Sequence, residues 1–168
     1  MSTTGDFFDR FQRSAWRLEC RPFYQPDAAE FDRWQHGQPP TIDQQQQRQR
    51  WIDGVTTASQ SGRTVGRVLV VTLPLTPYWR WRVETGRQHA AAGEDIRVAD
   101  RSKHPDLGDL GDFWMFDDAH TLLLDYDPHG AFLHAHPVTD QTVVDRYRHQ
   151  RDQGIAGSVP LAEFLVTR

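Results

Sequence analysis

The chain has 168 residues, of which 38% are hydrophobic and 25% are charged, and its formal net charge is −4. This length and composition are typical of one globular domain and exclude a largely disordered chain, while the acidic balance argues against direct binding of nucleic acid through phosphate neutralisation. The single cysteine, Cys20, excludes an intramolecular disulfide, and no apolar run is long enough to cross a membrane, so we expect a cytoplasmic protein without membrane contact.

The first third of the chain predicts a strand between helices. Residues 7–11 predict a short helix, and the alternation in residues 14–20 predicts a strand. Asp27 and Glu30 have the spacing of a capping box, which opens a helix that ends at Gly37.

A segment rich in Gln and Pro comes next. We interpret residues 36–47 as a flexible segment, in which the run Gln44–Gln47 forms the exposed start of a further helix capped near Asp43. Its later turns are expected to bury four apolar side chains, Trp51, Ile52, Val55 and Ala58.

The middle of the chain carries the clearest local signals. Val65–Leu73 is rich in β-branched residues and predicts a strand. Thr76 as N-cap and Pro77 at the first helical position then predict a helix that runs to about Ala92. A short strand over Asp95–Ala99 and a loop over Arg101–Gly111 follow.

The last third predicts a strand, a hairpin and two helices. The strand is Phe113–Phe116, and the hairpin joins His120–Tyr126 to Ala131–Val138 through a four-residue turn, which pairs Leu124 with Leu133. Asp140 is expected to cap a long helix ended by Gly154, and Leu161–Leu165 to form a short terminal helix. The whole order predicts an α+β fold, with a mixed, largely antiparallel sheet and helices packed on it, as a single domain over residues 1–168.

Two histidines of the hairpin share one face of a strand. His134 and His136 are two residues apart, and Asp125 lies on the same face of the partner strand. We expect no cofactor and no resident metal, because a solvent-facing strand accepts histidine readily. A metal site of His134, His136 and Asp125 is the geometrically feasible alternative.

The main candidate site is a group of charged residues on elements expected to be central. Burying an unpaired charge is costly, so these groups must pair with each other or line a cleft. One alternative is an internal network that ties helix to sheet, and it includes Glu19 and Arg80; the other is a cleft for a polar ligand. The expected ligand-binding residues are Arg17, Arg67, Arg82, Glu84, Glu94, Arg97, Asp112, Trp114 and Asp117.

The aromatic residues give a second expectation about surfaces. Trp79 and Trp81 cannot both face the same side of one helix, so one of them is expected to be exposed and to mark a partner surface, for a homodimer or another protein. Cys20 is expected to be a small buried hydrophobe rather than a catalytic thiol.

Several blocks resemble a family of actinobacterial domains of unknown function. They include Ala92-Gly-Glu-Asp-Ile-Arg97 and Asp112-Phe-Trp-Met-Phe-Asp-Asp118, in an order that spans nearly the whole chain. Members of that family often look to be encoded beside helix-turn-helix regulators, which implies a regulatory or interaction role with such a DNA-binding protein as partner. The element order is also similar to half of a phospholipase D-like domain, but the catalytic His and Lys of that superfamily are missing here.

Two functions follow from these observations. The first is a non-enzymatic regulatory or binding domain, whose charged cleft holds a small polar ligand or a partner segment. The alternative is a small enzyme, in secondary metabolism or a degenerate phosphodiesterase, that uses Glu94 or Asp117 as general base and an arginine as anion clamp.

Overall fold

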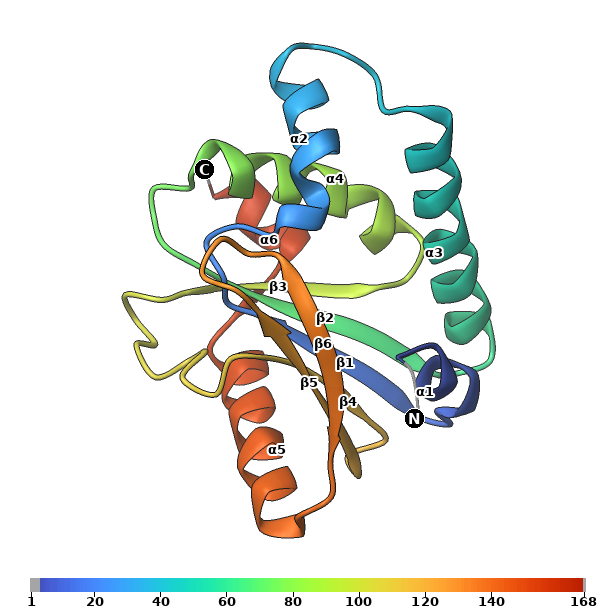
Figure 1. Cartoon of the computed structure of the whole chain (residues 1–168), viewed down its shortest axis with the longest axis vertical. Coiled ribbons are helices and arrows are strands. Elements are labelled where there is room, and N and C mark those ends of the chain that lie inside the picture. The colour runs from blue at the N-terminus through green and yellow to red at the C-terminus, as the bar shows by residue number, and fades with distance from the viewer. Residues whose placement is uncertain (1–3, 168) are drawn as a thin grey trace.

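A computed structural model describes residues 4–167, which form one mixed sheet with helices on both faces (Figure 1). The strands are β1 (Ser14–Glu19), β2 (Thr64–Val71), β3 (Asp95–Asp100), β4 (Asp112–Phe116), β5 (His120–Tyr126), β6 (Phe132–Val138) and β7 (Val159–Pro160). The helices are α1 (Thr4–Arg10), α2 (Ala28–Gln35), α3 (Ile42–Gln60), α4 (Pro77–Ala91), α5 (Gln141–Ala156) and α6 (Leu161–Val166), with a 3-10 turn at Gln25–Asp27. The predicted α+β class is confirmed.

The order of strands across the sheet is β6-β5-β4-β1-β2-β3-β7. The pairs β1–β2 and β2–β3 are parallel, because α2 and α3 cross over between the first two strands and α4 crosses over between the next two. The other neighbouring pairs are antiparallel. The two-residue strand β7, which extends the sheet beyond β3, was not predicted from the sequence.

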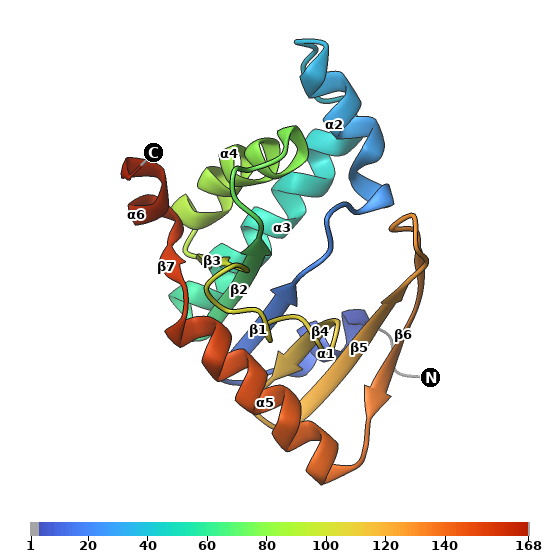
Figure 2. The ribbon, with the colours of Figure 1, turned by 90° about the vertical axis from the view of Figure 1, so that its left-hand side faces the viewer.

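The helices divide unevenly between the two faces of the sheet. Helix α5 covers one face, and α3, α4 and α6 cover the other, as the turned view in Figure 2 shows. On the α5 face, Trp16, Leu18 and Val68 belong to one apolar cluster. On the opposite face two apolar clusters lie apart, one under α4 and α6 and the other under α1 and α3.

The helix starts that carry a clear local signal are confirmed. The Thr76 hydroxyl accepts a hydrogen bond from the Trp79 amide at 3.3 Å, with Pro77 at the start of α4. Asp140 accepts from two amides at the start of α5, at 2.8 and 3.2 Å. Each cap satisfies amides that the helix itself leaves without a partner.

The capping box predicted at Asp27 is wrong. The Asp27 side chain caps no amide of α2, and it accepts instead from the Tyr78 hydroxyl at 2.5 Å. Glu30 forms an ion pair with Arg48 on α3. The local pattern assigned both carboxylates to the start of α2, but each binds a residue that is distant in the sequence.

Helix α3 begins near Asp43 as predicted, although Asp43 itself is not the capping residue. Thr41 caps α3, and Gln44 completes the box by accepting from the Thr41 amide at 2.8 Å. Residues 42–47 therefore belong to a helix, and the predicted flexibility of 36–47 stays a prediction. Val55 and Ala58 of α3 are buried as expected, whereas Trp51 and Ile52 are half-buried.

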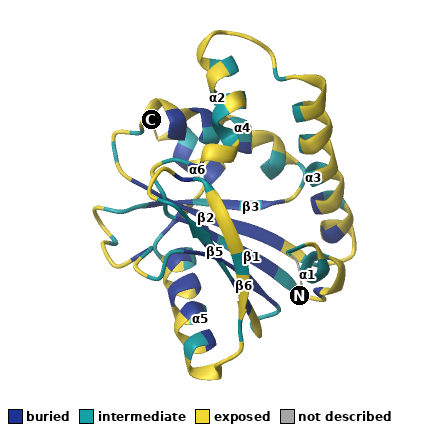
Figure 3. Ribbon diagram, viewed as in Figure 1, coloured by how far each residue is buried: buried dark blue, intermediate teal, exposed yellow. Residues whose placement is uncertain are grey.

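The hairpin closes in a different register from the predicted one. Leu124 pairs with Ala135 rather than with Leu133, and a shift in pairing lies between Asp125 and Tyr126. A slip of two residues keeps each side chain on its face, so Asp125 still shares a face with the two histidines. Leu133, predicted as core, is 58% exposed. Strand β6 is largely exposed along its length, as Figure 3 shows.

Two further predictions about packing are corrected. Gly154 does not end α5 but lies inside it, where the missing side chain lets the helix approach Leu18 and Val68 of the sheet. Trp79 and Trp81 are both buried. Helix α4 is covered from two sides, because Tyr24 packs against Trp79 while Phe31 of α2 packs against Trp81.

None of the helices within residues 4–167 combines the length and the apolar character that crossing a membrane requires.

Candidate functional site

Charged side chains separate the two apolar clusters on the face of the sheet that α3 and α4 cover. Along β2, Val65 belongs to one cluster and Leu69 to the other, and Arg67 lies between them. Arg17 of β1 is directly opposite Arg67, and Glu19 follows two residues later on the same face. Strand alternation therefore puts two arginines and a glutamate where the core would otherwise be continuous.

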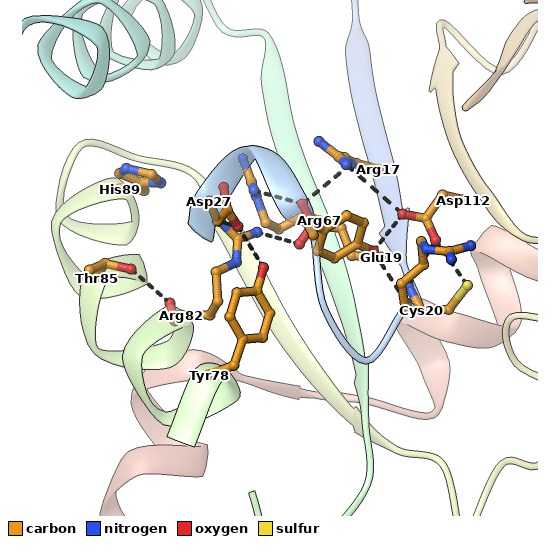
Figure 4. A network of polar contacts seen from close by, with 12 residues as sticks. Arg17, Glu19, Cys20, Asp27, Arg67, Tyr78, Arg82, Thr85, His89 and Asp112 are labelled. Atoms are coloured by element: carbon orange, nitrogen blue, oxygen red, sulfur yellow. Dashed lines mark hydrogen bonds and ion pairs between the residues drawn. The ribbon is translucent and has the colours of Figure 1, made fainter. Parts of the chain in front are cut away.

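Glu19 is the centre of this group, which we call the buried ion network (Figure 4). Its side chain is fully buried. One carboxylate oxygen lies 3.0 Å from Arg67 Nη1 and 3.3 Å from Arg17 Nε, and the other pairs with Arg82 of α4. Burial opposes ionisation, but the three guanidinium groups outweigh it and hold the pKa of Glu19 well below its ordinary value.

Glu94, just before β3, extends the network under α3 and α4. One of its oxygens pairs with Arg67, and the other accepts from the Trp51 indole N–H at 2.8 Å. His89 Nδ1 lies 3.6 Å from the same oxygen. Burial and the nearby charge of Arg67 lower the pKa of His89 to about 4, so this imidazole is neutral at physiological pH.

Asp112, the first residue of β4, forms the other end of the network. It accepts from the Tyr24 hydroxyl at 2.5 Å and from the Cys20 amide and thiol at 3.1 and 3.0 Å. Arg17 Nη2 lies 3.9 Å away. Burial raises the pKa of Asp112, and burial together with Asp112 raises that of the Cys20 thiol. Cys20 is thus held as a thiol, which is a poor nucleophile.

Each arginine of the buried network has at least one carboxylate partner. Arg17, Arg67 and Arg82 face three carboxylates, and the guanidinium of Arg17 also lies 5.7 Å from the ring centre of Tyr24 and 5.8 Å from that of Trp114. The three acidic partners are Glu19, Glu94 and Asp112. Paired charges of this kind join α4 to the central strands, because Arg82 of α4 reaches Glu19 of β1.

The structure brings together six of the nine predicted ligand-binding residues. These are Arg17, Arg67, Arg82, Glu94, Asp112 and Trp114. These six residues were predictable because a buried charge on a central strand is costly and needs charged partners on the same face of the sheet.

The other three predicted residues lie elsewhere. Glu84 is exposed on α4, at a groove of about 640 Å³ between α4 and α6 that contains none of the network. Arg97 lies on the opposite face of β3, where it donates to Ser158 Oγ at 3.1 Å. Asp117 follows β4 and accepts from the amides of residues 12–14 at 2.7 to 3.0 Å. Burial opposes ionisation of Asp117, but the hydrogen bonds from these amides outweigh burial and lower its pKa.

Sequence reasoning missed several polar partners of the network. The sequence predicts a packing role alone for Trp51, and it gives no polar role to Tyr24, Tyr78 or His89. Each has one polar atom that donates to a carboxylate or lies near one: Tyr24 to Asp112, Trp51 and His89 to Glu94, and Tyr78 to the partly exposed Asp27. The signal that could have found them is that a buried Tyr or Trp needs a hydrogen-bond partner.

A small pocket opens between α2, α3 and α4 beside the network. Its volume is about 130 Å³, and we call it the network pocket. Arg82 and His89 line it, and within residues 4–167 Arg82 Nε and His89 Nε2 are buried without a hydrogen-bond partner. The full lining is Asp27, Glu30, Gln44, Gln47, Arg48, Trp51, Trp81, Arg82, Thr85 and His89.

The two histidines predicted as a metal alternative do meet Asp125. His134 Nε2 and His136 Nδ1 lie 3.1 and 3.0 Å from the same carboxylate oxygen. All three residues are on the exposed hairpin, and their side chains lie on the opposite face of the sheet from the network.

A model of a domain of unknown function, DUF6879, matches residues 2–166. The chain belongs to this family. No curated protein matches this DUF6879 domain. The predicted membership of a family of unknown function is confirmed, whereas the actinobacterial origin and the likeness to half of a phospholipase D-like domain stay predictions.

Proposed function

We propose that this DUF6879 domain is a non-enzymatic binding module that holds one small polar group in the network pocket. The observation that carries the proposal is the pair of buried nitrogens without partners, Arg82 Nε and His89 Nε2, on two residues that line the same pocket. Buried polar atoms are nearly always satisfied in folded proteins, so a ligand atom is a natural partner for each.

The chemistry of the two nitrogens selects the kind of group. Arg82 Nε–H can only donate. His89 is neutral, and the approach of its Nδ1 to a Glu94 oxygen at 3.6 Å favours the tautomer that carries the proton on Nδ1, which leaves Nε2 as an acceptor. A primary carboxamide, which accepts through its oxygen and donates through its nitrogen, matches both atoms.

The charges around the pocket favour a neutral group over an anion. Arg48 pairs with Glu30, and Arg82 pairs with Glu19 and lies 3.6 Å from Asp27. No lining arginine is therefore left without a carboxylate. The rings of Trp51 and Trp81 line the pocket and can pack against the aliphatic part of a ligand that carries the carboxamide. The pocket volume of about 130 Å³ is enough for one small group, such as the end of an Asn or Gln side chain.

The two carboxylates named as general base in the enzyme alternative, Glu94 and Asp117, are already engaged in contacts. Both oxygens of Glu94 are already engaged, by Arg67 and by the Trp51 indole. Both oxygens of Asp117 accept backbone amides. Protonation of either carboxylate would weaken the contacts that it already makes, which favours a binding role over acid–base work.

Within this proposal, the carboxamide belongs to a polar ligand or to an Asn or Gln side chain of a partner segment. A helix-turn-helix regulator is the partner that the family resemblance favours, and resemblance is its only support. The proposal keeps the cytoplasmic location expected from the single cysteine.

Titration with small probes, followed by NMR, tests the proposal. The reporter is the indole N–H of Trp51, which lines the pocket and donates to Glu94. We expect acetamide to shift this resonance in a saturable way, and acetate and phosphate to do so far less.

Two variants and one control locate the binding. His89→Leu removes the acceptor, and Thr85→Leu fills the pocket without removing an ion pair; both should abolish the acetamide response. Arg80→Ala, an exposed change on the same helix, should leave it intact. A response that survives both pocket variants, or a stronger response to acetate, would overturn the proposal.

A further inference from the structure

The β5–β6 hairpin carries a cluster of two histidines and one aspartate that is separate from the buried ion network. Asp125 pairs across the hairpin with His134, and Leu123 pairs with His136. Because His134 and His136 are two residues apart on one strand, both imidazoles lie on the face that Asp125 shares. The two rings stack, with centroids 5.5 Å apart.

Both imidazoles approach the same oxygen atom of Asp125, so the three side chains surround one small volume. A single carboxylate oxygen, Asp125 Oδ2, lies 3.1 Å from His134 Nε2 and 3.0 Å from His136 Nδ1. All three atoms lie within 4.8 Å of one another. In a tetrahedral zinc site with bonds of about 2.1 Å, ligand atoms are about 3.4 Å apart, so small rotations of exposed side chains would complete the geometry.

We propose that Asp125, His134 and His136 bind a divalent transition metal, of which zinc suits the ligand set best. Imidazole nitrogen and carboxylate oxygen are both common zinc ligands, and three protein ligands leave a fourth position open to water or another group. This site is independent of the network pocket and does not rest on the proposed function.

The surroundings of the hairpin permit such a site. Among residues 4–167, Asp125 forms ion pairs with the two histidines and with no arginine. Tyr147 of α5 lies near Asp125, and burial, opposed by Arg146 and supported by Asp125, raises its pKa, so the phenol stays neutral there. Strand β6 is an edge strand with exposed side chains, so a metal can enter without opening the fold.

Calorimetric titration of the untagged, chelator-treated protein with zinc chloride tests the proposal. We expect one zinc per chain at neutral pH, with a heat that disappears when a chelator removes the zinc again. Cobalt(II) in place of zinc should produce the visible absorption of a tetrahedral site.

Variants of the exposed hairpin residues can test zinc binding without a large loss of stability. Asp125→Asn should weaken zinc binding by at least about tenfold, as losses around metal sites typically do, and the double change His134→Gln with His136→Gln should abolish it. His129→Gln removes an imidazole from the turn of the same hairpin and should leave binding unchanged. Absence of stoichiometric heat in the native protein, or zinc binding that survives the double change, would refute the site.

Discussion

Replacement of Glu19 by glutamine is the sharpest test of the buried ion network. The side chain is fully buried, and its two oxygens face Arg67, Arg17 and Arg82. Glutamine keeps the size of the side chain but removes its charge, which leaves the buried carboxylates of Glu94 and Asp112 to pair with three guanidinium groups. The amide NH2 of the glutamine also faces one of these guanidinium groups, donor against donor. Breaking one partner of a buried ionic group costs about 3–5 kcal/mol.

The loss should be visible in simple unfolding measurements. For a domain of this size, each kcal/mol lowers the melting temperature by about 2–4 °C, so we expect a drop of about 10 °C. Urea unfolding at neutral pH measures the same change as free energy. Glu84→Gln is the matched control, because Glu84 is exposed on α4, and it should change stability by less than about 0.5 kcal/mol.

The pH dependence distinguishes a lost charge from lost packing. The folded-state pKa of Glu19 is lowered, so its ionic stabilisation is complete above the unfolded pKa of about 4.3 and falls as the pH drops below that value. The gap in stability between the native chain and Glu19→Gln should therefore narrow as pH falls from 5 toward 3. A variant as stable as the native chain at neutral pH, or a gap that does not change with pH, would refute the reasoning.

Three shorter predictions concern groups around the sheet. Gly66→Ala would place a Cβ 2.5 Å from the Trp16 ring and should cost about 1–3 kcal/mol; an unchanged melting curve would contradict it. Cys20, whose thiol pKa burial and Asp112 raise, should react with a thiol reagent at least about tenfold more slowly in the native than in the denatured chain, and equal rates would exclude this. His89, with its pKa lowered to about 4 by burial and Arg67, should show neutral-imidazole chemical shifts by NMR down to about pH 5; its contribution to stability is present above an unfolded pKa of about 6.5 and declines as pH falls toward 4.

The parts of the fold that sequence predicted well depend on short-range physics. Thr76 and Pro77 define the start of α4 because the cap satisfies amides within one turn. The β-branched run in β2 predicts a strand because such side chains restrict the backbone locally. Asp140 before α5 succeeded for the same reason.

The same kind of local signal failed where a distant partner competed. Asp27 has the right spacing for a capping box, yet the Tyr78 hydroxyl occupies its carboxylate. Asp117 looked like a site acid, yet its side chain closes a turn onto the amides before β1. Nothing in the neighbouring residues reveals which bond prevails, because the competing donor arrives from another part of the chain.

The amino-acid sequence by itself determined that charged side chains would lie on central strands and would need each other, because alternation assigns them a face and burial penalises an unpaired charge. Only the tertiary structure decided which partners they take. Crossover helices bring Arg82 and Trp51 over the sheet, and the register of the β5–β6 hairpin brings Asp125 to two histidines. Those contacts depend on strand order and helix placement, which arise from packing of the whole chain rather than from any local pattern.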